Sequence, residues 1–316
     1  MAKYWQQTIL DELVNLLKAG ELYLFAGAGV SCLAGLPSWK KLLTQFSEAY
    51  KKLSNNDRNV VEELPGLLRN CNTVIVDHLL SLGIEGQKLY SKILVSNFCG
   101  DCYSDVHRWL LELPFAGYVT TNYDLCFENT CRKKNLKPNL INCSRFCYPR
   151  NQFDCNGRDI GGLRQNKPFL LHMHGCIEHN GRYDMDNIIL TNNQYGKFYK
   201  TAEMNRIYDD CFYEHVLILG TSLKDPYFVN KFREKRGLGS TTNIVNRKKC
   251  YVVRHEDEKS QSPNSDKIAL DVVYDYFGDW NNGLRNMVSE LSEDYKGKVS
   301  RPNEIQAIEF GKKATK

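Results

Sequence analysis

Apolar segments that end in small or polar residues recur along this sequence, and they constrain its fold more than any other feature. Each segment has apolar residues at consecutive positions, the pattern of a strand that is buried on both faces. Helical patterns separate the segments, so the sequence predicts a doubly wound α/β fold with a parallel sheet. Five strands are predicted and a sixth is expected after them: residues 22–27, 115–124, 168–175, 215–222, 249–255 and 271–278.

Two other segments are predicted to lie outside the sheet. Residues 54–113 have an irregular helical pattern with several turn signals. Most of residues 126–166 lacks periodicity and is rich in Asn, Arg, Cys and Gly. We expect a single domain over residues 1–316, in which 54–113 and 126–166 form a smaller helical and irregular module.

Composition and charge give no indication of several classes of protein. The net charge of +5 is spread along 316 residues, so no dedicated nucleic-acid-binding surface is indicated. No apolar run is as long as a membrane span, and residues 1–20 have an amphipathic pattern without the apolar core of a signal peptide. We therefore expect a cytoplasmic protein that does not contact a membrane.

The chain has twelve cysteines, which we interpret as reduced thiols because no secretion signal is present. Cys99 and Cys102 form a C-x-x-C pair, and Cys143 and Cys147 form a C-x-x-x-C pair. Zinc sites use such spacings, so zinc remains an open alternative. The aromatic Phe146 inside the second pair favours packing over ligation, and we expect no metal.

Four of the predicted strands end in polar or small residues, at 27–31, 120–124, 174–175 and 220–222. Ligands bind doubly wound sheets at the carboxyl ends of their strands, so these residues predict a ligand site. The first end, GAGVS, can bring backbone N–H groups toward a phosphate. It matches neither G-x-G-x-x-G nor a G-K-[ST] loop, and a tight strand-to-helix crossing explains its glycines equally well.

The other strand ends carry side chains that could bind or react. Asn122 can hold a hydroxyl or a water and Asp124 can accept from an amide or a ribose, although both could instead cap the next turn and helix. Alternation would place His172 and His174 on one face of a strand, where a histidine that titrates near neutrality suits a general base. The pair could also be metal ligands, and His172 fits a hydrogen-bonded interior histidine better. Ser222 could bind a phosphate or a ribose.

Five segments in this order resemble the sirtuin-like superfamily, and within it the bacterial anti-phage NAD-hydrolase (NADase) branch: GAGVS (27–31), LPSW (36–39), TTNYD (120–124), HMHG (172–175) and LGTSLKDP (219–226). The resemblance implies a Rossmann-like, NAD-binding sheet with an inserted helical module, and cleavage of the nicotinamide–ribose bond. By position, Asn122 would orient the ribose or the attacking water, and His174 would be the base near the ribose hydroxyls.

The resemblance also assigns residues that would bind NAD+ as the substrate. The pyrophosphate and the nearby ribose would be contacted by Gly27, Ala28, Gly29 and Ser31. Asp124 would contact the nicotinamide amide, and Gly220 and Ser222 would support the adenosine side.

Two departures separate the chain from protein-deacylating sirtuins. Those enzymes have two C-x-x-C pairs after the histidine motif, whereas the cysteine pairs here precede His174. They also have Asp-Phe-Arg where this chain has Ser38, Trp39 and Lys40. Both departures favour hydrolysis of NAD+ to nicotinamide and ADP-ribose over deacylation.

The predicted function is therefore that of an NAD+ glycohydrolase, the toxic effector of an anti-phage, abortive-infection system. The length leaves no obvious room for a sensor domain, so we expect regulation through a homo-oligomer or a separately encoded sensor or ATPase partner. Two alternatives remain open. One is a deacylase or ADP-ribosyltransferase, which a peptide cleft and bound zinc would distinguish. The other is a module that senses NAD or ADP-ribose without turnover, which need not keep both Asn122 and His174.

Overall fold

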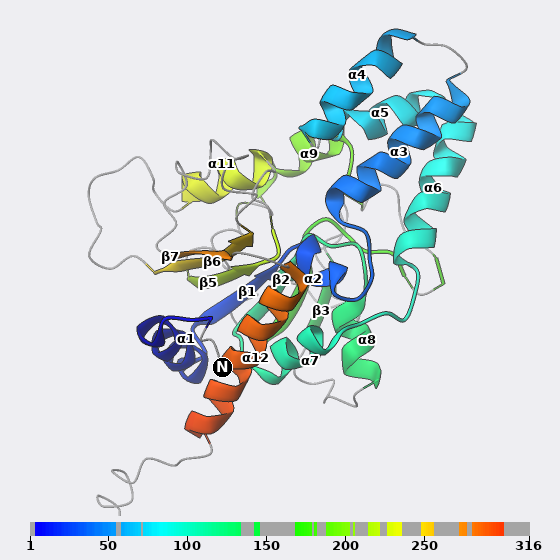
Figure 1. Cartoon of the computed structure of the whole chain (residues 1–316). Coiled ribbons are helices and arrows are strands. Elements are labelled where there is room, and N and C mark those ends of the chain that lie inside the picture. Colours follow the sequence, from blue (N-terminus) through cyan, green and yellow to red (C-terminus); the bar gives the residue numbers. More distant parts are fainter. Residues whose placement is uncertain are drawn as a thin grey trace, which may run out of the picture.

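A seven-stranded sheet runs through the middle of the molecule (Figure 1). The computed structural model describes residues 4–54, 58–70, 72–133, 142–145, 168–178, 180–181, 188–202, 205, 214–221, 226–235, 248–255, 272–276 and 280–299. The strands are β1 Leu22–Ala26, β2 Gly117–Thr120, β3 Asn142–Arg145, β4 Phe169–His172, β5 His215–Leu219, β6 Cys250–His255 and β7 Val272–Tyr276. All neighbouring strands are parallel, in the order β3-β4-β2-β1-β5-β6-β7.

The order of the strands defines where a ligand site is expected. From β1 the chain first builds one side of the sheet with β2, β3 and β4, and then returns to build the other side with β5, β6 and β7. The switch falls at β1, which pairs with both β2 and β5. Crevices at such a switch point, outside the carboxyl ends of the strands, are where doubly wound sheets bind ligands.

Alternate residues of each central strand enter two separate hydrophobic clusters, one on each face of the sheet. In β1, Tyr23 and Phe25 join one cluster, while Leu22, Leu24 and Ala26 join the other. The first cluster is covered by α9 Asn192–Phe198 and α11 Pro226–Lys235, and the second mainly by α1 Gln7–Ala19, α7 Asp105–Glu112 and α12 Trp280–Val299. Burial on both faces explains the continuous apolar runs of the sequence.

A third hydrophobic cluster belongs to a group of helices at one side of the sheet (Figure 1). These helices are α3 Trp39–Leu53, α4 Arg58–Arg69, α5 Val74–Ser81 and α6 Ile84–Phe98. Tyr123, Ile177 and Leu190, from loops that follow or approach the strand ends, pack into the same cluster. We call α3 to α6 the helical module. The next helix, α7, packs instead against α8 Cys126–Lys133 and α12.

The doubly wound, parallel sheet with a smaller helical module is confirmed, including the expected last strand, β7. Two predictions about strands were wrong. The segment 126–166, expected to be helical or irregular, contains the edge strand β3, which its polar sequence NCSR does not reveal. The second concerns β4, which ends at His172, so that His174 lies in the turn that follows and the two histidines do not share a strand face.

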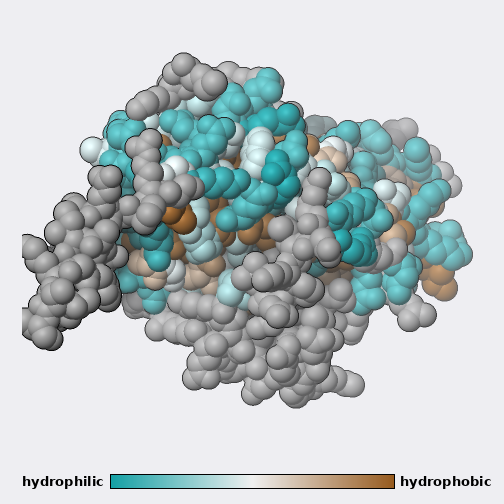
Figure 2. All heavy atoms as spheres, turned by 90° about the horizontal axis from the view of Figure 1, so that it is seen from below, coloured by the Kyte–Doolittle hydropathy of each residue, from teal (hydrophilic) through white to brown (hydrophobic). Residues whose placement is uncertain are grey.

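Large hydrophobic side chains are mostly covered. In the part of the chain that the structure describes, the exposed ones are Ile84 and Val299. On the face seen in Figure 2, hydrophobic residues show mainly in recesses between hydrophilic ones. None of the helices within the described ranges combines the length and the apolar character that crossing a membrane requires.

Candidate active site

A cavity of about 580 Å³ lies between the carboxyl ends of the strands and the helical module. Pockets that bind small molecules and cofactors have volumes of about 300–1,000 Å³. Segments after β1, β2, β4 and β5 line one part of it, and residues of the module such as Trp39, Thr73 and Phe98 line another. Of the predicted site residues, the structure brings together Gly27, Ala28, Ser31, Asn122, Asp124, His174 and Gly220 around this cavity.

Gly27 and Gly220 allow the segments after β1 and β5 to approach each other closely. The N–H of Gly29 donates to the backbone oxygen of Gly220 at 2.7 Å. A Cβ on Gly27 would lie 2.6 Å from that oxygen, and Gly220 has a φ of +68°. The alternative of a tight crossing therefore accounts for these two glycines. Gly29 does not line the cavity, and Ser222 lies outside the described residues.

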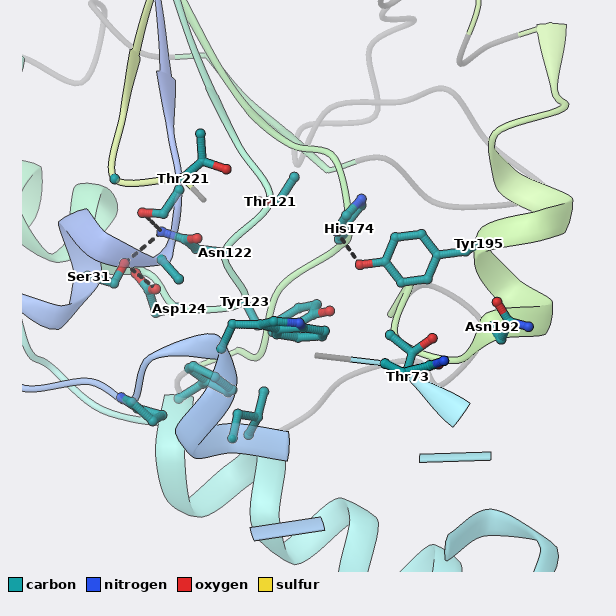
Figure 3. A pocket seen from close by; sticks show the side chains of 18 of the residues that line it. Ser31, Thr73, Thr121, Asn122, Tyr123, Asp124, His174, Asn192, Tyr195 and Thr221 are labelled. Atoms are coloured by element: carbon teal, nitrogen blue, oxygen red, sulfur yellow. Dashed lines mark hydrogen bonds between the residues drawn. The ribbon is translucent and has the colours of Figure 1, made fainter. Parts of the chain in front are cut away.

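Ser31, Asn122 and Asp124 form a buried hydrogen-bond network at the cavity wall (Figure 3). The side-chain nitrogen of Asn122 donates to the Ser31 hydroxyl at 2.7 Å and to the backbone oxygen of Gly27 at 3.0 Å. The Ser31 hydroxyl in turn donates to Asp124 Oδ2 at 2.7 Å. Since its nitrogen is engaged, Asn122 presents its side-chain oxygen toward the cavity (Figure 3).

Asp124 also starts the helix that follows it. Its Oδ1 accepts from the backbone N–H of Cys126, the first residue of α8, at 3.0 Å. The capping alternative is therefore realised for Asp124, which still lines the cavity. The side chain of Asn122, in contrast, reaches across to Gly27, the residue after β1, and the backbone N–H of Asn122 donates to the hydroxyl of Thr120 at 3.0 Å.

His174 is enclosed by aromatic side chains from α9 and the residue after it. Its Nε2 lies 2.9 Å from the Tyr199 hydroxyl and its Nδ1 lies 3.5 Å from the Tyr195 hydroxyl. The rings of Tyr195, Phe198 and Tyr199 pack edge-on against the imidazole. Burial lowers the pKa of His174 to about 3, so the imidazole is neutral. The expectation of a histidine that titrates near neutrality was wrong for this environment.

His172 has a structural place, as its interior position predicts. Its Nδ1 lies 3.0 Å from the backbone oxygen of Asn122 and its Nε2 lies 3.0 Å from Glu128 Oε1. Both neighbours accept hydrogen bonds, so the imidazole satisfies them only when doubly protonated. Burial lowers the pKa of His172, but the charge and hydrogen bond of Glu128 outweigh it and raise the pKa overall.

Several residues of the site were not found from the sequence. Tyr195 and Tyr199 stand four apart, a spacing that equally indicates ordinary core packing on a helix. Asn192 and Thr73 line the cavity from segments that carry no recognisable motif. Only the fold reveals that Thr73, Asn192 and Tyr195 lie around the same cavity as the strand ends (Figure 3).

Within the described ranges, no group of three or more His, Cys, Asp or Glu side chains is placed to hold a metal ion. Cys147 lies outside those ranges, and for Cys143 the structure describes the backbone but not the side chain. The zinc alternative across the two cysteine pairs is therefore untested.

Named relatives share a similar stretch of sequence. NAD(+) hydrolase ThsA of Cytobacillus dafuensis is 23% identical over 239 residues, 73% of this chain and 42% of that protein. NAD(+) hydrolase ThsA of Enterococcus faecium is 25% identical over 226 residues, 70% of this chain and 41% of that protein. Defense-associated sirtuin 2 of Bacillus subtilis is 22% identical over 190 residues, 59% of this chain and 16% of that protein. The chain thus spans less than half the length of these relatives.

The profile of one protein family matches residues 116–273, which is half of the chain. The matched stretch begins just before β2 and includes β2 to β6 and the first two residues of β7, Val272 and Val273. It contains Asn122, Asp124, His174 and Gly220, four of the residues gathered around the cavity. The chain therefore belongs to the family of proteins with a SIR2-like domain.

Proposed function

We propose that the cavity binds NAD+ and hydrolyses its nicotinamide–ribose bond, giving nicotinamide and ADP-ribose. The observation that carries the proposal is that Asn122 and His174, from the ends of two different strands, line one cavity at the switch point of the sheet. The names of the relatives from Cytobacillus dafuensis and Enterococcus faecium, both NAD(+) hydrolases, support the same reaction.

In the proposed reaction the bond between the ribose C1′ and the nicotinamide nitrogen breaks, and its electron pair leaves with nicotinamide. Positive charge develops on the ribose, and a water oxygen then bonds to C1′ and releases a proton to the solvent. The inward-facing oxygen of Asn122 accepts a hydrogen bond from that water or from a ribose hydroxyl, which fixes the direction of attack.

His174 acts as a neutral hydrogen-bonding group on the ribose rather than as a base that is half-protonated at neutral pH. Its low pKa leaves a ring nitrogen as an acceptor, and the hydroxyls of Tyr195 and Tyr199 set the orientation of the ring. An imidazole oriented in this way can accept a hydrogen bond from a ribose hydroxyl when the substrate displaces one tyrosine hydroxyl.

The remaining predicted site residues bind the other parts of the dinucleotide. Gly27, Ala28 and Ser31 contact the pyrophosphate and the nearby ribose, and Asp124 accepts from the nicotinamide amide. Gly220 supports the adenosine side of the dinucleotide, and the N–H of Gly29 holds Gly220 in place by donating to its backbone oxygen. Ser222 is a further contact to the adenosine side. The whole chain forms one NAD-binding domain, with the helical module as the second wall of its cavity.

We place this activity in anti-phage defence, in line with the name of the Bacillus subtilis relative. An enzyme that depletes NAD+ harms its own cell, so it requires a trigger. A homo-oligomer and a separately encoded sensor or ATPase are the regulators that we propose, for a protein of the cytoplasm that leads an infected cell to abortive infection.

The test is to incubate the purified chain with NAD+ and, in parallel, with NADP+, and to separate the products by chromatography. Nicotinamide and ADP-ribose are expected in equal amounts from NAD+. Asn15→Ala, at an exposed position of α1, is the matched control for Asn122→Ala and should release nicotinamide at the wild-type rate. If NAD+ is bound but stays intact with and without candidate partners, the proposed hydrolysis is wrong and a sensing role takes its place.

A further inference from the structure

Cys102 and Cys126 place two thiols side by side, close to the segment that carries Asn122 and Asp124. Their sulfurs lie 3.9 Å apart. Cys102 belongs to the segment before α7 and is half-buried, whereas the Cys126 side chain is fully buried. A disulfide needs the sulfurs at about 2 Å, so the gap that remains to be closed is about 2 Å.

Polar contacts hold the two cysteines in this relative position. The side chain of Asn129, on α8, donates to the backbone oxygen of Cys102 at 3.1 Å. Asp101, the preceding residue, accepts from Arg132 of the same helix at 2.6 Å. Because Cys126 begins this helix, the folded chain keeps the two thiols together.

The two thiols differ in reactivity. The pKa of Cys102 is lowered, chiefly by the hydrogen bond between its sulfur and that of Cys126. The same hydrogen bond, together with burial, raises the pKa of Cys126. Thiolates are the reactive form, so the more exposed Cys102 is where an oxidant attacks. Cys32, which also lies near Asp124, is a poorer target because burial raises its pKa.

Cys126 is linked to the candidate active site through its backbone. Its N–H donates to Asp124 Oδ1, and the other carboxylate oxygen of Asp124, Oδ2, accepts from the Ser31 hydroxyl. The Ser31 hydroxyl is also the acceptor for the side-chain nitrogen of Asn122. A shift of Cys126 toward Cys102 therefore acts on the network that positions Asn122.

We propose that Cys102 and Cys126 are a peroxide-sensitive dithiol, whose oxidation to a disulfide displaces Asp124 and slows the reaction in the cavity. The Cys102 thiolate attacks one oxygen of hydrogen peroxide, and the O–O bond breaks to give a sulfenic acid and hydroxide, which takes up a proton. The Cys126 sulfur then attacks the Cys102 sulfur, and the S–O bond breaks as the Cys126 proton leaves with the hydroxide. Two thiols are oxidised by two electrons and the peroxide is reduced to two waters.

The effect on activity rests on the proposed hydrolysis of NAD+, but formation of the disulfide does not. The experiment treats the full chain with equimolar hydrogen peroxide, alkylates the remaining thiols, digests without reductant and maps the peptides by mass spectrometry. Wild type and the matched control Cys99→Ser should both give a peptide pair linked through Cys102 and Cys126, and Cys102→Ser should not.

Nicotinamide release is measured on the same samples. Oxidation should lower it about 100-fold in wild type and in Cys99→Ser, the loss that a displacement of about 1 Å can cause, and dithiothreitol should restore it. Cys102→Ser should keep its rate after peroxide treatment. Absence of the linked peptides from oxidised wild type, or an equal loss of rate in Cys102→Ser, would overturn the proposal. Linked peptides in a protein that never releases nicotinamide would instead contradict the proposed hydrolysis and leave the dithiol standing.

Discussion

The side chain of Asn122 has two tasks, because its nitrogen supports the fold and its oxygen faces the cavity. Asn122→Ala should lower the rate of nicotinamide release about 10²- to 10⁴-fold through loss of the positioning oxygen. It should also lower the free energy of unfolding by about 1–3 kcal/mol, since Ser31 and the Gly27 carbonyl lose a donor. Kinetics and urea unfolding, each compared with Asn15→Ala, measure the two effects. A rate loss no larger than the fraction of unfolded protein would show that Asn122 is only structural.

His174 provides a second prediction at the scale of a residue. Its pKa of about 3 lies below the usual 6.5, so the imidazole should stay neutral from pH 8 to pH 5. An NMR titration of the ring protons, assigned with His174→Gln, should show no transition for His174 in that range. A midpoint between pH 6 and pH 7 would mean that the aromatic enclosure does not hold in solution.

At the scale of elements, the close approach of the segments that follow β1 and β5 depends on Gly27. Gly27→Ala places a Cβ 2.6 Å from the Gly220 carbonyl oxygen and 2.8 Å from the Thr221 Cβ, so it should lower the free energy of unfolding by about 1–3 kcal/mol. Gly297→Ala, in α12 where an added Cβ meets nothing within 4 Å, should raise it by about 0.5–1 kcal/mol. Urea unfolding of both variants checks the pair, and equal stabilities would contradict the close approach.

The helical module is connected to His174 through α9. Asp77 of α5 accepts from the N–H of Asn192 at 3.0 Å, and α9 then leads to Tyr195 and Tyr199. Asp77→Ala should therefore loosen the enclosure of His174 and lower kcat more than it raises KM. Asp77→Asn keeps an acceptor oxygen and should retain most of kcat. Identical kinetics for wild type and Asp77→Ala would show that this contact does not reach the site.

The strands and the residues at their ends were predictable because consecutive apolar residues, followed by small or polar ones, form a local pattern in the sequence. The edge strand β3 was missed since its polar residues carry no such pattern. The environment of His174 was missed for another reason: it depends on Tyr195 and Tyr199, which the fold brings to it from another segment. Likewise, Asp124 both caps α8 and lines the cavity, and the motif alone does not show which of these two roles it has.

At the scale of the whole molecule, three buried histidines shape how stability depends on pH. His107 and His174 have pKa values of about 4 and about 3, so below pH 6.5 the unfolded chain binds protons that the folded chain does not. The free energy of unfolding should then fall by about 1–3 kcal/mol per pH unit between pH 6 and pH 4.5. His172 has a raised pKa, so its contribution is complete below pH 6.5 and is lost only as pH rises.

Urea unfolding at pH 6.0 and pH 5.0 measures this slope, and His174→Gln isolates one of its sources. The variant should lose less stability than wild type over the same interval. Equal slopes for the two proteins would contradict the depressed pKa of His174.

In the proposed reaction, water attacks the ribose C1′ of NAD+ in the cavity between the strand ends and the helical module. The most direct measurement is incubation with NAD+ in water enriched in oxygen-18, followed by mass spectrometry of the ADP-ribose. Wild type should give ADP-ribose with one heavy oxygen. At equal concentration of folded protein, Asn122→Ala and His174→Gln should each give less than about one hundredth of that amount of labelled ADP-ribose. The same amount of labelled ADP-ribose from the variants, or none from wild type that binds NAD+, would contradict the proposed reaction.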